Sequence, residues 1–152
     1  MKELVLGCDN AAVGLMSEIR AFLDERSIKY IFVGVENSSD NTYYPLVAQS
    51  VAEEIIASNY QKDGLLICGT GIGMSITANK FPGIYAALCH DNYSAERARL
   101  SNNANVLCMG ARVVGPELAK KILAEWLNLE FKGGPSQLKV SVIKDIEEKL
   151  YK

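Results

Sequence analysis

The residues best suited to chemistry lie between positions 66 and 75, where a cysteine, a threonine and three alternating glycines follow an apolar run. Glycines let the backbone turn tightly with its N–H groups pointing inward, and a following helix N-terminus adds partial positive charge. The turn at 69–73 is therefore expected to bind an anion. Cys68 begins this turn, in a setting that favours thiolate over thiol, and Thr70 adds a hydroxyl beside it. This pairing suits proton abstraction next to a carbonyl, because the amides would stabilise the developing enediolate.

The same residues also fit a plain glycine-rich turn between a strand and a helix, with a buried thiol and a turn hydroxyl. Two better-known anion loops do not fit them. GTGIGM lacks the third glycine of the GxGxxG dinucleotide loop and follows the third apolar run instead of the first. No GK[ST] follows, so the turn is not a P-loop.

Strands and helices must position this turn. Alternating apolar runs and apolar helical stripes in the sequence predict where they lie. Short apolar runs separated by helical periods are typical of parallel strands buried on both faces by crossover helices. This pattern predicts one α/β domain over residues 1–152, a three-layer sandwich with a five-stranded parallel sheet. The strands are expected at 3–8, 30–35, 64–69, 84–89 and 105–110, and the apolar helical stripes at 12–23, 45–58, 116–130 and 137–150.

The last predicted helix differs from the others because no strand follows it. It comes after Gly133, Gly134 and Pro135, and we expect it to pack across a subunit boundary, or else on the surface of its own subunit. In open α/β sheets, ligands bind beyond the carboxyl ends of the strands. This rule selects the residues at 8–10, 68–73, 90–91 and 111–112.

Composition and charge exclude several other classes of protein. The chain has 152 residues, 49% of them apolar, and a net charge of -2, which gives no electrostatic footprint for nucleic acid or an anionic membrane surface. No apolar run approaches the roughly 20 residues that cross a bilayer, so we expect a cytoplasmic protein with a small-molecule partner. The four cysteines form no CxxC pair or zinc-like cluster. Cys8, Cys89 and Cys108 are expected to fill buried strand positions.

Six motifs in one order carry a family resemblance. They are GCDN at 7–10, TYYP at 42–45, ICGTGIGMSITANKFPGI at 67–84, YSA at 93–95, NNANVL at 102–107 and GARVVG at 110–115. Together they resemble the type B ribose-5-phosphate isomerases and the related galactose-6-phosphate isomerase subunits, over essentially the whole chain.

The resemblance implies a flavodoxin-like, or Rossmann-like, homodimer that interconverts ribose 5-phosphate and ribulose 5-phosphate, a step of the pentose phosphate pathway, without metal or cofactor. It implies that Cys68 moves the proton between C1 and C2 and that Thr70 assists transfer between O1 and O2. The implied substrate-binding residues are Asp9 on a sugar hydroxyl, Tyr44 lining the pocket, the amides of Gly69, Gly71 and Gly73 on the enediolate, Asn102 from the partner subunit, and Arg112 on the phosphate. Alternatively, Asp9 caps a helix, Tyr44 belongs to the core and Arg112 forms a surface ion pair.

Departures from the family pattern concentrate where the ligand would bind. Asn10 replaces a phosphate-binding histidine, Ser101 replaces a ring-opening histidine, and the segment at 133–139 leaves a proline and Lys139 in place of two arginines. Tyr85 stands where an arginine is frequent. Phosphate would then rest on Arg112, with Lys139, Asn10 and Ser136 as further donors. Because serine has no pKa near neutrality, Ser101 cannot replace an imidazole as a proton shuttle.

Two hypotheses reconcile Cys68 with a missing ring opener. In the first, His90, the only histidine, has taken over ring opening. In the second, the substrate cannot close to a furanose, as with a tetrose phosphate such as erythrulose 4-phosphate. Galactose 6-phosphate and allose 6-phosphate are further candidate substrates, and a galactose-6-phosphate isomerase subunit would need a different partner chain. A non-catalytic phosphate- or nucleotide-binding module is the alternative of another class, while a thiol redox protein is disfavoured because no resolving cysteine lies near Cys68 in sequence.

Overall fold

The computed structural model of the chain describes residues 1–151, which fold into five strands and six α-helices with two short 3-10 turns. The strands are β1 (Glu3–Cys8), β2 (Tyr30–Phe32), β3 (Lys62–Cys68), β4 (Ala86–Leu88) and β5 (Val106–Gly110). The helices are α1 (Val13–Glu25), α2 (Tyr44–Ala57), α3 (Ile72–Ala78), α4 (Asn92–Leu100), α5 (Pro116–Leu127) and α6 (Gln137–Leu150). The 3-10 turns are η1 (Asn10–Ala12) and η2 (Gly134–Ser136).

All five strands are parallel and lie in the order β2-β1-β3-β5-β4. The predicted flavodoxin-like α/β fold is confirmed, with the last two strands exchanged relative to the flavodoxin order 2-1-3-4-5. The direction of strand addition reverses between β1 and β3. The carboxyl ends of these two strands, at Cys8 and Cys68, therefore flank the crevice where sheets of this type bind ligands.

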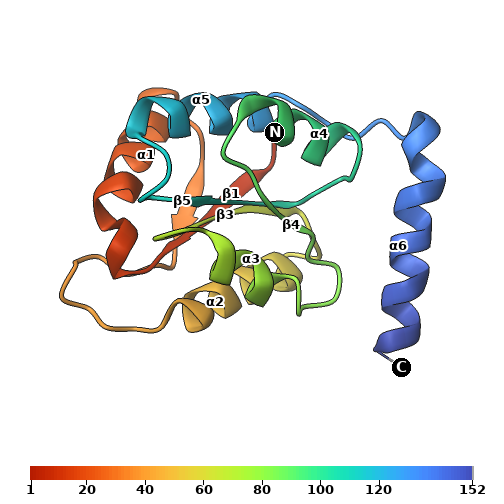
Figure 1. Cartoon of the computed structure of the whole chain (residues 1–152), viewed down its shortest axis with the longest axis horizontal. Helices are drawn as coiled ribbons and strands as arrows, with labels where there is room; N and C mark the ends of the chain where they lie inside the picture. The colour runs from red at the N-terminus through yellow and green to blue at the C-terminus, as the bar shows by residue number, and fades with distance from the viewer. Residues whose placement is uncertain (152) are drawn as a thin grey trace.

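Helices cover both faces of the sheet. In Figure 1, α1, α4 and α5 lie on one face, and α2 and α3 lie on the other. The apolar stripe predicted on α1 is buried, and β1 and β3 are buried along nearly their whole length. Gly7 lets α2 approach β1 closely, because a side chain there would collide with Val47 and Val51 of that helix. The two layers therefore clamp the strands that lead to the crevice.

The two edge strands are shorter than their apolar runs predict, for a local reason in each case. Beyond Phe32, the N–H groups of Val33 and Val35 still donate to β1 carbonyls, but the chain bends and regular pairing ends. Ahead of β4, side-chain amides replace the sheet partners: Asn105 accepts from the Tyr85 N–H, and Asn79 exchanges two hydrogen bonds with Ala86.

The helix bounds agree with the predicted stripes at α1, α2 and α6, and differ at two others. The stripe at 116–130 is three residues too long, because α5 ends at Leu127 and Asn128 caps it. Helix α4 has no predicted stripe. It buries only Ala95, Ala98 and Arg99, too few apolar residues to give a readable pattern.

Helix α6 stands at the side of the domain in Figure 1, reached by the segment at 128–133. Polar contacts hold it there: Glu147 accepts from the Gly83 N–H and the Tyr85 hydroxyl, and the Tyr151 hydroxyl donates to the Lys80 carbonyl. Only one residue of α6 is buried. A stripe of exposed apolar side chains at four-residue steps runs along it, made of Leu138, Val142, Ile146 and Leu150.

Candidate functional site

Cys68 ends β3 and faces the start of the glycine-rich turn. The N–H of Gly71 donates to Cys68 Sγ at 3.1 Å, and the side chain is 5% exposed. Gly71 adopts φ 77°, a left-handed conformation that glycine accepts without strain, and a side chain there would collide with Leu88 and the backbone of Met109. Helix α3 begins at the next residue, so the sulfur lies beside both a directed N–H and a helix N-terminus.

The turn rests on the chain that leaves β5. The Ala111 N–H donates to the Cys68 carbonyl at 2.8 Å, and the Arg112 N–H donates to the Gly69 carbonyl at 3.0 Å. Gly110 packs directly on the backbone of Thr70, where any side chain would overlap it. These contacts fix residues 68–70 against residues 110–112.

Three further predicted residues gather around this turn. The ring of Tyr44 lies against Gly73, and it is 40% exposed, so it lines the surface of the site and does not belong to the core. The Arg112 guanidinium lies over Gly69. Within residues 1–151 no carboxylate lies within ion-pair distance of Arg112, so the guanidinium can bind an external anion. Thr70 is exposed, and its hydroxyl accepts from the Ile72 N–H at 3.3 Å.

Asp9 and Asn10 follow β1 on the other side of the crevice. Asp9 caps η1, because its Oδ1 accepts from the Ala11 N–H at 3.1 Å. The capping role considered for Asp9 is therefore present, although capping occupies only one of the two carboxylate oxygens. The Asn10 side-chain amide donates to Asn41 Oδ1 at 3.5 Å, which links it to the loop before α2.

His90 lies just beyond β4 at the same edge of the sheet. Its Nε2 accepts a hydrogen bond from the Gly110 N–H at 2.8 Å. This bond occupies the lone pair that a neutral imidazole would use as a base, and it leaves the proton on Nδ1. His90 therefore makes a structural hydrogen bond at the end of the strand.

The structure does not bring Ser101, Asn102 and Lys139 to the turn within one chain. Ser101 ends α4, where its hydroxyl accepts two hydrogen bonds from the Arg97 guanidinium, at 2.7 and 2.9 Å. Asn102 lines a hollow beside β4, together with Ile143 of α6. Lys139 is exposed on α6. Ser101 and Asn102 precede β5, at the amino edge of the sheet, whereas Cys68 lies at the carboxyl edge.

The other three cysteines are buried, as predicted. Burial, with a smaller contribution from Asp9, raises the pKa of Cys8 to about 12. Burial and Asp91 raise the pKa of Cys89 to about 11. Burial also raises the pKa of Cys108, which lies wholly inside the protein. None of these thiols is suited to act as a base at neutral pH.

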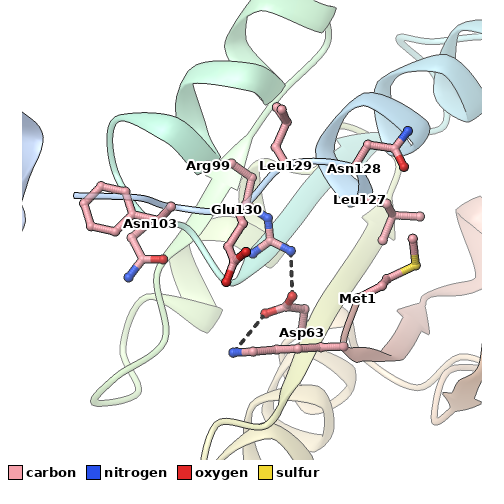
Figure 2. A pocket seen from close by; sticks show the side chains of 10 residues that line it. Met1, Asp63, Arg99, Asn103, Leu127, Asn128, Leu129 and Glu130 are labelled. Carbon is pink, nitrogen blue, oxygen red and sulfur yellow. Dashed lines mark hydrogen bonds and ion pairs between the residues drawn. The ribbon is translucent and has the colours of Figure 1, made fainter. Parts of the chain in front are cut away.

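A second hollow, of about 350 Å³, lies at the opposite edge of the sheet (Figure 2). Its floor is a buried ion pair in which Arg99 Nη2 donates to Asp63 Oδ2 at 2.6 Å. Arg99 also donates to the carbonyls of Ala104 and Trp126, and its Cζ lies 3.5 Å from the centroid of the Trp126 ring. Each nitrogen of the guanidinium therefore has a partner within the protein, while Asp63 Oδ1 has no hydrogen-bond partner in residues 1–151 and faces the Lys2 ammonium at 3.9 Å. The ion pair has a structural role in linking β3 to α4.

None of the helices in residues 1–151 is long and apolar enough to cross a bilayer. In the same residues, no group of three or more histidine, cysteine, aspartate or glutamate side chains is arranged to hold a metal ion.

Comparison with known proteins agrees with this geometry. The model of the family described as Ribose/Galactose Isomerase matches residues 4–143. The chain is 48% identical to D-erythrulose-4-phosphate isomerase of Pectobacterium atrosepticum, covering 94% of this chain and 93% of the relative. It is 46% identical to ribose-5-P isomerase B of Listeria innocua, covering 97% and 98%. The solved structure of Clostridium thermocellum ribose-5-phosphate isomerase B matches with a TM-score of 0.91 at 40% identity, covering 97% and 99%.

Fold, turn and relatives define a class of sugar-phosphate isomerases built on a parallel α/β sheet. The chain belongs to the ribose/galactose isomerase family. The family prediction is confirmed. The relatives carry two different substrates in their names, a pentose phosphate and a tetrose phosphate, so membership sets the type of reaction more closely than the sugar.

Sequence reasoning missed two contacts at the site. Gly110 supplies the N–H that His90 holds, yet the sequence marked it only as the end of a strand. Asn41, in the loop before α2, accepts a hydrogen bond from the Asn10 side chain. A signal for Gly110 was present, since a glycine at the end of a buried strand suggests a close backbone approach. No signal in the sequence pointed to Asn41.

Proposed function

We propose that the chain is an aldose–ketose isomerase that acts on a phosphorylated sugar through a cis-enediolate. The observation that carries the proposal is the N–H of Gly71 directed at Cys68 Sγ, on a turn at the carboxyl edge of the sheet. The contact places a main-chain donor on the sulfur, and the thiolate is the form of cysteine that can accept a proton from carbon.

In the proposed reaction, Cys68 removes the proton from C2 of the open-chain aldose. The C–H electron pair forms the C1–C2 double bond of the enediolate, and the charge develops on O1. Cys68 returns the proton to C1, while Thr70 assists proton transfer between O1 and O2, which yields the ketose. Since the Gly71 N–H is directed at the sulfur, the enediolate would rest mainly on the amides of Gly69 and Gly73.

Arg112 is the proposed phosphate-binding residue. Its guanidinium lies over Gly69 and carries a charge that strengthens each hydrogen bond to an anion roughly twofold. Asn10 and Asn41 offer only neutral amides nearby, and Lys139 would have to come from another chain. The site should therefore bind phosphate with fewer positively charged side chains than the family pattern provides.

Ribose 5-phosphate is the first candidate substrate. D-erythrulose 4-phosphate is the second, and a specific contact favours it. At the position of the family's ring-opening histidine, the Ser101 hydroxyl is bound to the Arg97 guanidinium and no imidazole is present. A tetrose esterified at O4 cannot close to a furanose, so it needs no ring opening.

We propose further that the active protein is a homodimer. The exposed apolar stripe on α6, in which Leu138 is 78% and Leu150 is 75% exposed, fits burial against a second copy. Within one chain Asn102 and Lys139 lie away from Cys68, and a second copy would allow them to line its site. Sedimentation of the wild-type chain beside Ile146→Glu tests this assembly, since the charge should yield monomers.

The test of function is a panel of C4, C5 and C6 sugar phosphates with their free sugars, assayed with wild type and Cys68→Ser. The wild type should turn over one phosphorylated chain length best, and the variant should lose about 10²- to 10⁴-fold in kcat, as expected for a missing general base. Solvent deuterium should enter at the carbon next to the carbonyl only with the wild type.

Each alternative predicts a different result in this panel. A non-catalytic binding module would leave the C2 proton in place with every sugar. A subunit that needs a different partner would be inactive when purified alone. Faster turnover of ribose 5-phosphate than of any tetrose phosphate would exclude the second candidate substrate.

A further inference from the structure

An unusual hydrogen bond closes the sheet beside the site. Strand β4 ends at Leu88, and the last main-chain bond to its neighbour runs from the Cys89 N–H to the Cys108 carbonyl. In a regular parallel pair, the next N–H on β5, that of Gly110, would donate to another main-chain carbonyl. Here it donates instead to Nε2 of the His90 side chain, at 2.8 Å. The imidazole nitrogen therefore takes the place of the main-chain carbonyl that a longer β4 would supply.

The group that His90 holds supports the catalytic turn. Gly110 is buried and packs on the backbone of Thr70. The two residues that follow, Ala111 and Arg112, donate their N–H groups to the carbonyls of Cys68 and Gly69. One imidazole thus secures the short segment against which the base, the hydroxyl and the phosphate-binding guanidinium are all placed.

We propose that His90 is a positioning residue, whose neutral imidazole fixes Gly110 and, through it, the turn that carries Cys68 and Thr70. This inference rests on the proposed isomerase function, and it assigns His90 no proton transfer to or from substrate. A buried N–H without an acceptor is costly, so loss of the imidazole would release Gly110 to seek another partner. The turn would then shift relative to bound substrate.

Two substitutions separate positioning from ring opening. His90→Gln keeps a side-chain acceptor of similar reach and removes the imidazole's acid–base chemistry, whereas His90→Leu removes both. With the best sugar phosphate from the panel, His90→Leu should lower kcat about 10- to 100-fold, the scale of a misplacement near 1 Å, with KM changed less than about threefold. His90→Gln should restore kcat to within about threefold of wild type.

The pattern across substrates decides between the two roles. A positioning role predicts the same loss with ribose 5-phosphate, which must open, and with erythrulose 4-phosphate, which is already open. If both variants are slow with ribose 5-phosphate and normal with erythrulose 4-phosphate, His90 opens the ring and the proposal is wrong. Asp91→Ala is the control for amide exchange alone and not for turnover, since Asp91 neighbours His90 and caps α4 through Ser94 but belongs to the ligand edge of the sheet.

Amide hydrogen exchange tests the proposal independently of turnover. Exchange at Gly110 and Arg112 should speed up at least about tenfold in His90→Leu and stay slow in His90→Gln and Asp91→Ala. Unchanged protection of Gly110 in His90→Leu would overturn the proposal. Absence of turnover in the wild type would refute the proposed function alone, because the exchange data would still show whether His90 holds the turn.

Discussion

The two edges of the sheet use charged and polar residues in opposite ways. At the amino edge, Arg99 and Asp63 are buried together, and every nitrogen of the guanidinium has a partner within the protein. At the carboxyl edge, the Arg112 guanidinium lies over a glycine with no carboxylate of the described residues 1–151 at ion-pair distance, and Thr70 is exposed. Both edges have a hollow or a crevice, so concavity alone does not identify the site.

The difference shows which feature to look for in a small α/β protein. A polar group whose bonds are complete stabilises the fold, whereas one held in place by the backbone with its polar atoms directed outward is available to a ligand. The backbone of the turn around Cys68 has hydrogen-bond partners within the protein, whereas the side chains of Thr70 and Arg112 have few. This contrast predicts that substitutions at the amino edge affect stability, and that substitutions at the carboxyl edge affect turnover.

The largest expected effect lies at the amino edge. Asp63→Ala leaves the buried Arg99 charge without its carboxylate, and it should lower the free energy of unfolding by about 3–5 kcal/mol. Urea unfolding measures this loss. Lys2→Met is the control, because the Lys2 ammonium lies 3.9 Å from Asp63 and is half-exposed, so it should cost at most about 1 kcal/mol. A kcat loss in folded Asp63→Ala as large as that of Cys68→Ser would break the contrast between the edges.

A smaller effect is expected at the carboxyl edge. Arg112→Gln removes the proposed charge-assisted contact to phosphate, and such a contact contributes about 1.5–3 kcal/mol, so KM should rise about 10- to 150-fold. The midpoint of urea unfolding should move little. Initial rates measured with the phosphorylated sugar show the KM effect, and Lys121→Gln, an exposed cation on α5, serves as the charge-matched control. An equal KM increase in both variants would mean that net charge, and not Arg112, attracts the substrate.

The smallest expected effect is the alkylation of a single thiol. It compares the reactivity of Cys68 with that of the thiols buried in the core. Because burial raises the pKa of Cys89 to about 11 and of Cys8 to about 12, almost none of either thiol is ionised at pH 8. Iodoacetamide should therefore add one group to the folded protein, at Cys68, and four to the unfolded chain. Mass spectrometry of wild type and Cys68→Ser reports both numbers, and labelling of Cys89 as fast as Cys68 would contradict the assignment.

The sequence predicted the scaffold well because apolar periodicity records burial directly. The buried strands β1, β3 and β5 gave clear runs. Strand β2 was overestimated because the chain bends after Phe32, and β4 was overestimated because Asn79, Asn105 and His90 take over hydrogen bonds that a strand would make. The turn around Cys68 was also readable from its glycines. The contact between His90 and Gly110 was not, since it depends on β5 lying between β3 and β4, which chain order does not reveal.

The strand order also determines when each strand can pair while the chain is being synthesised on the ribosome. Strands β1, β2 and β3 can pair as soon as they emerge, because they are neighbours in the finished sheet. Strand β4 pairs only with β5, so it must wait for a strand synthesised later. Arg112 and the support beneath Thr70 arrive with that last strand. The nascent chain can therefore acquire much of its core well before it acquires a competent site.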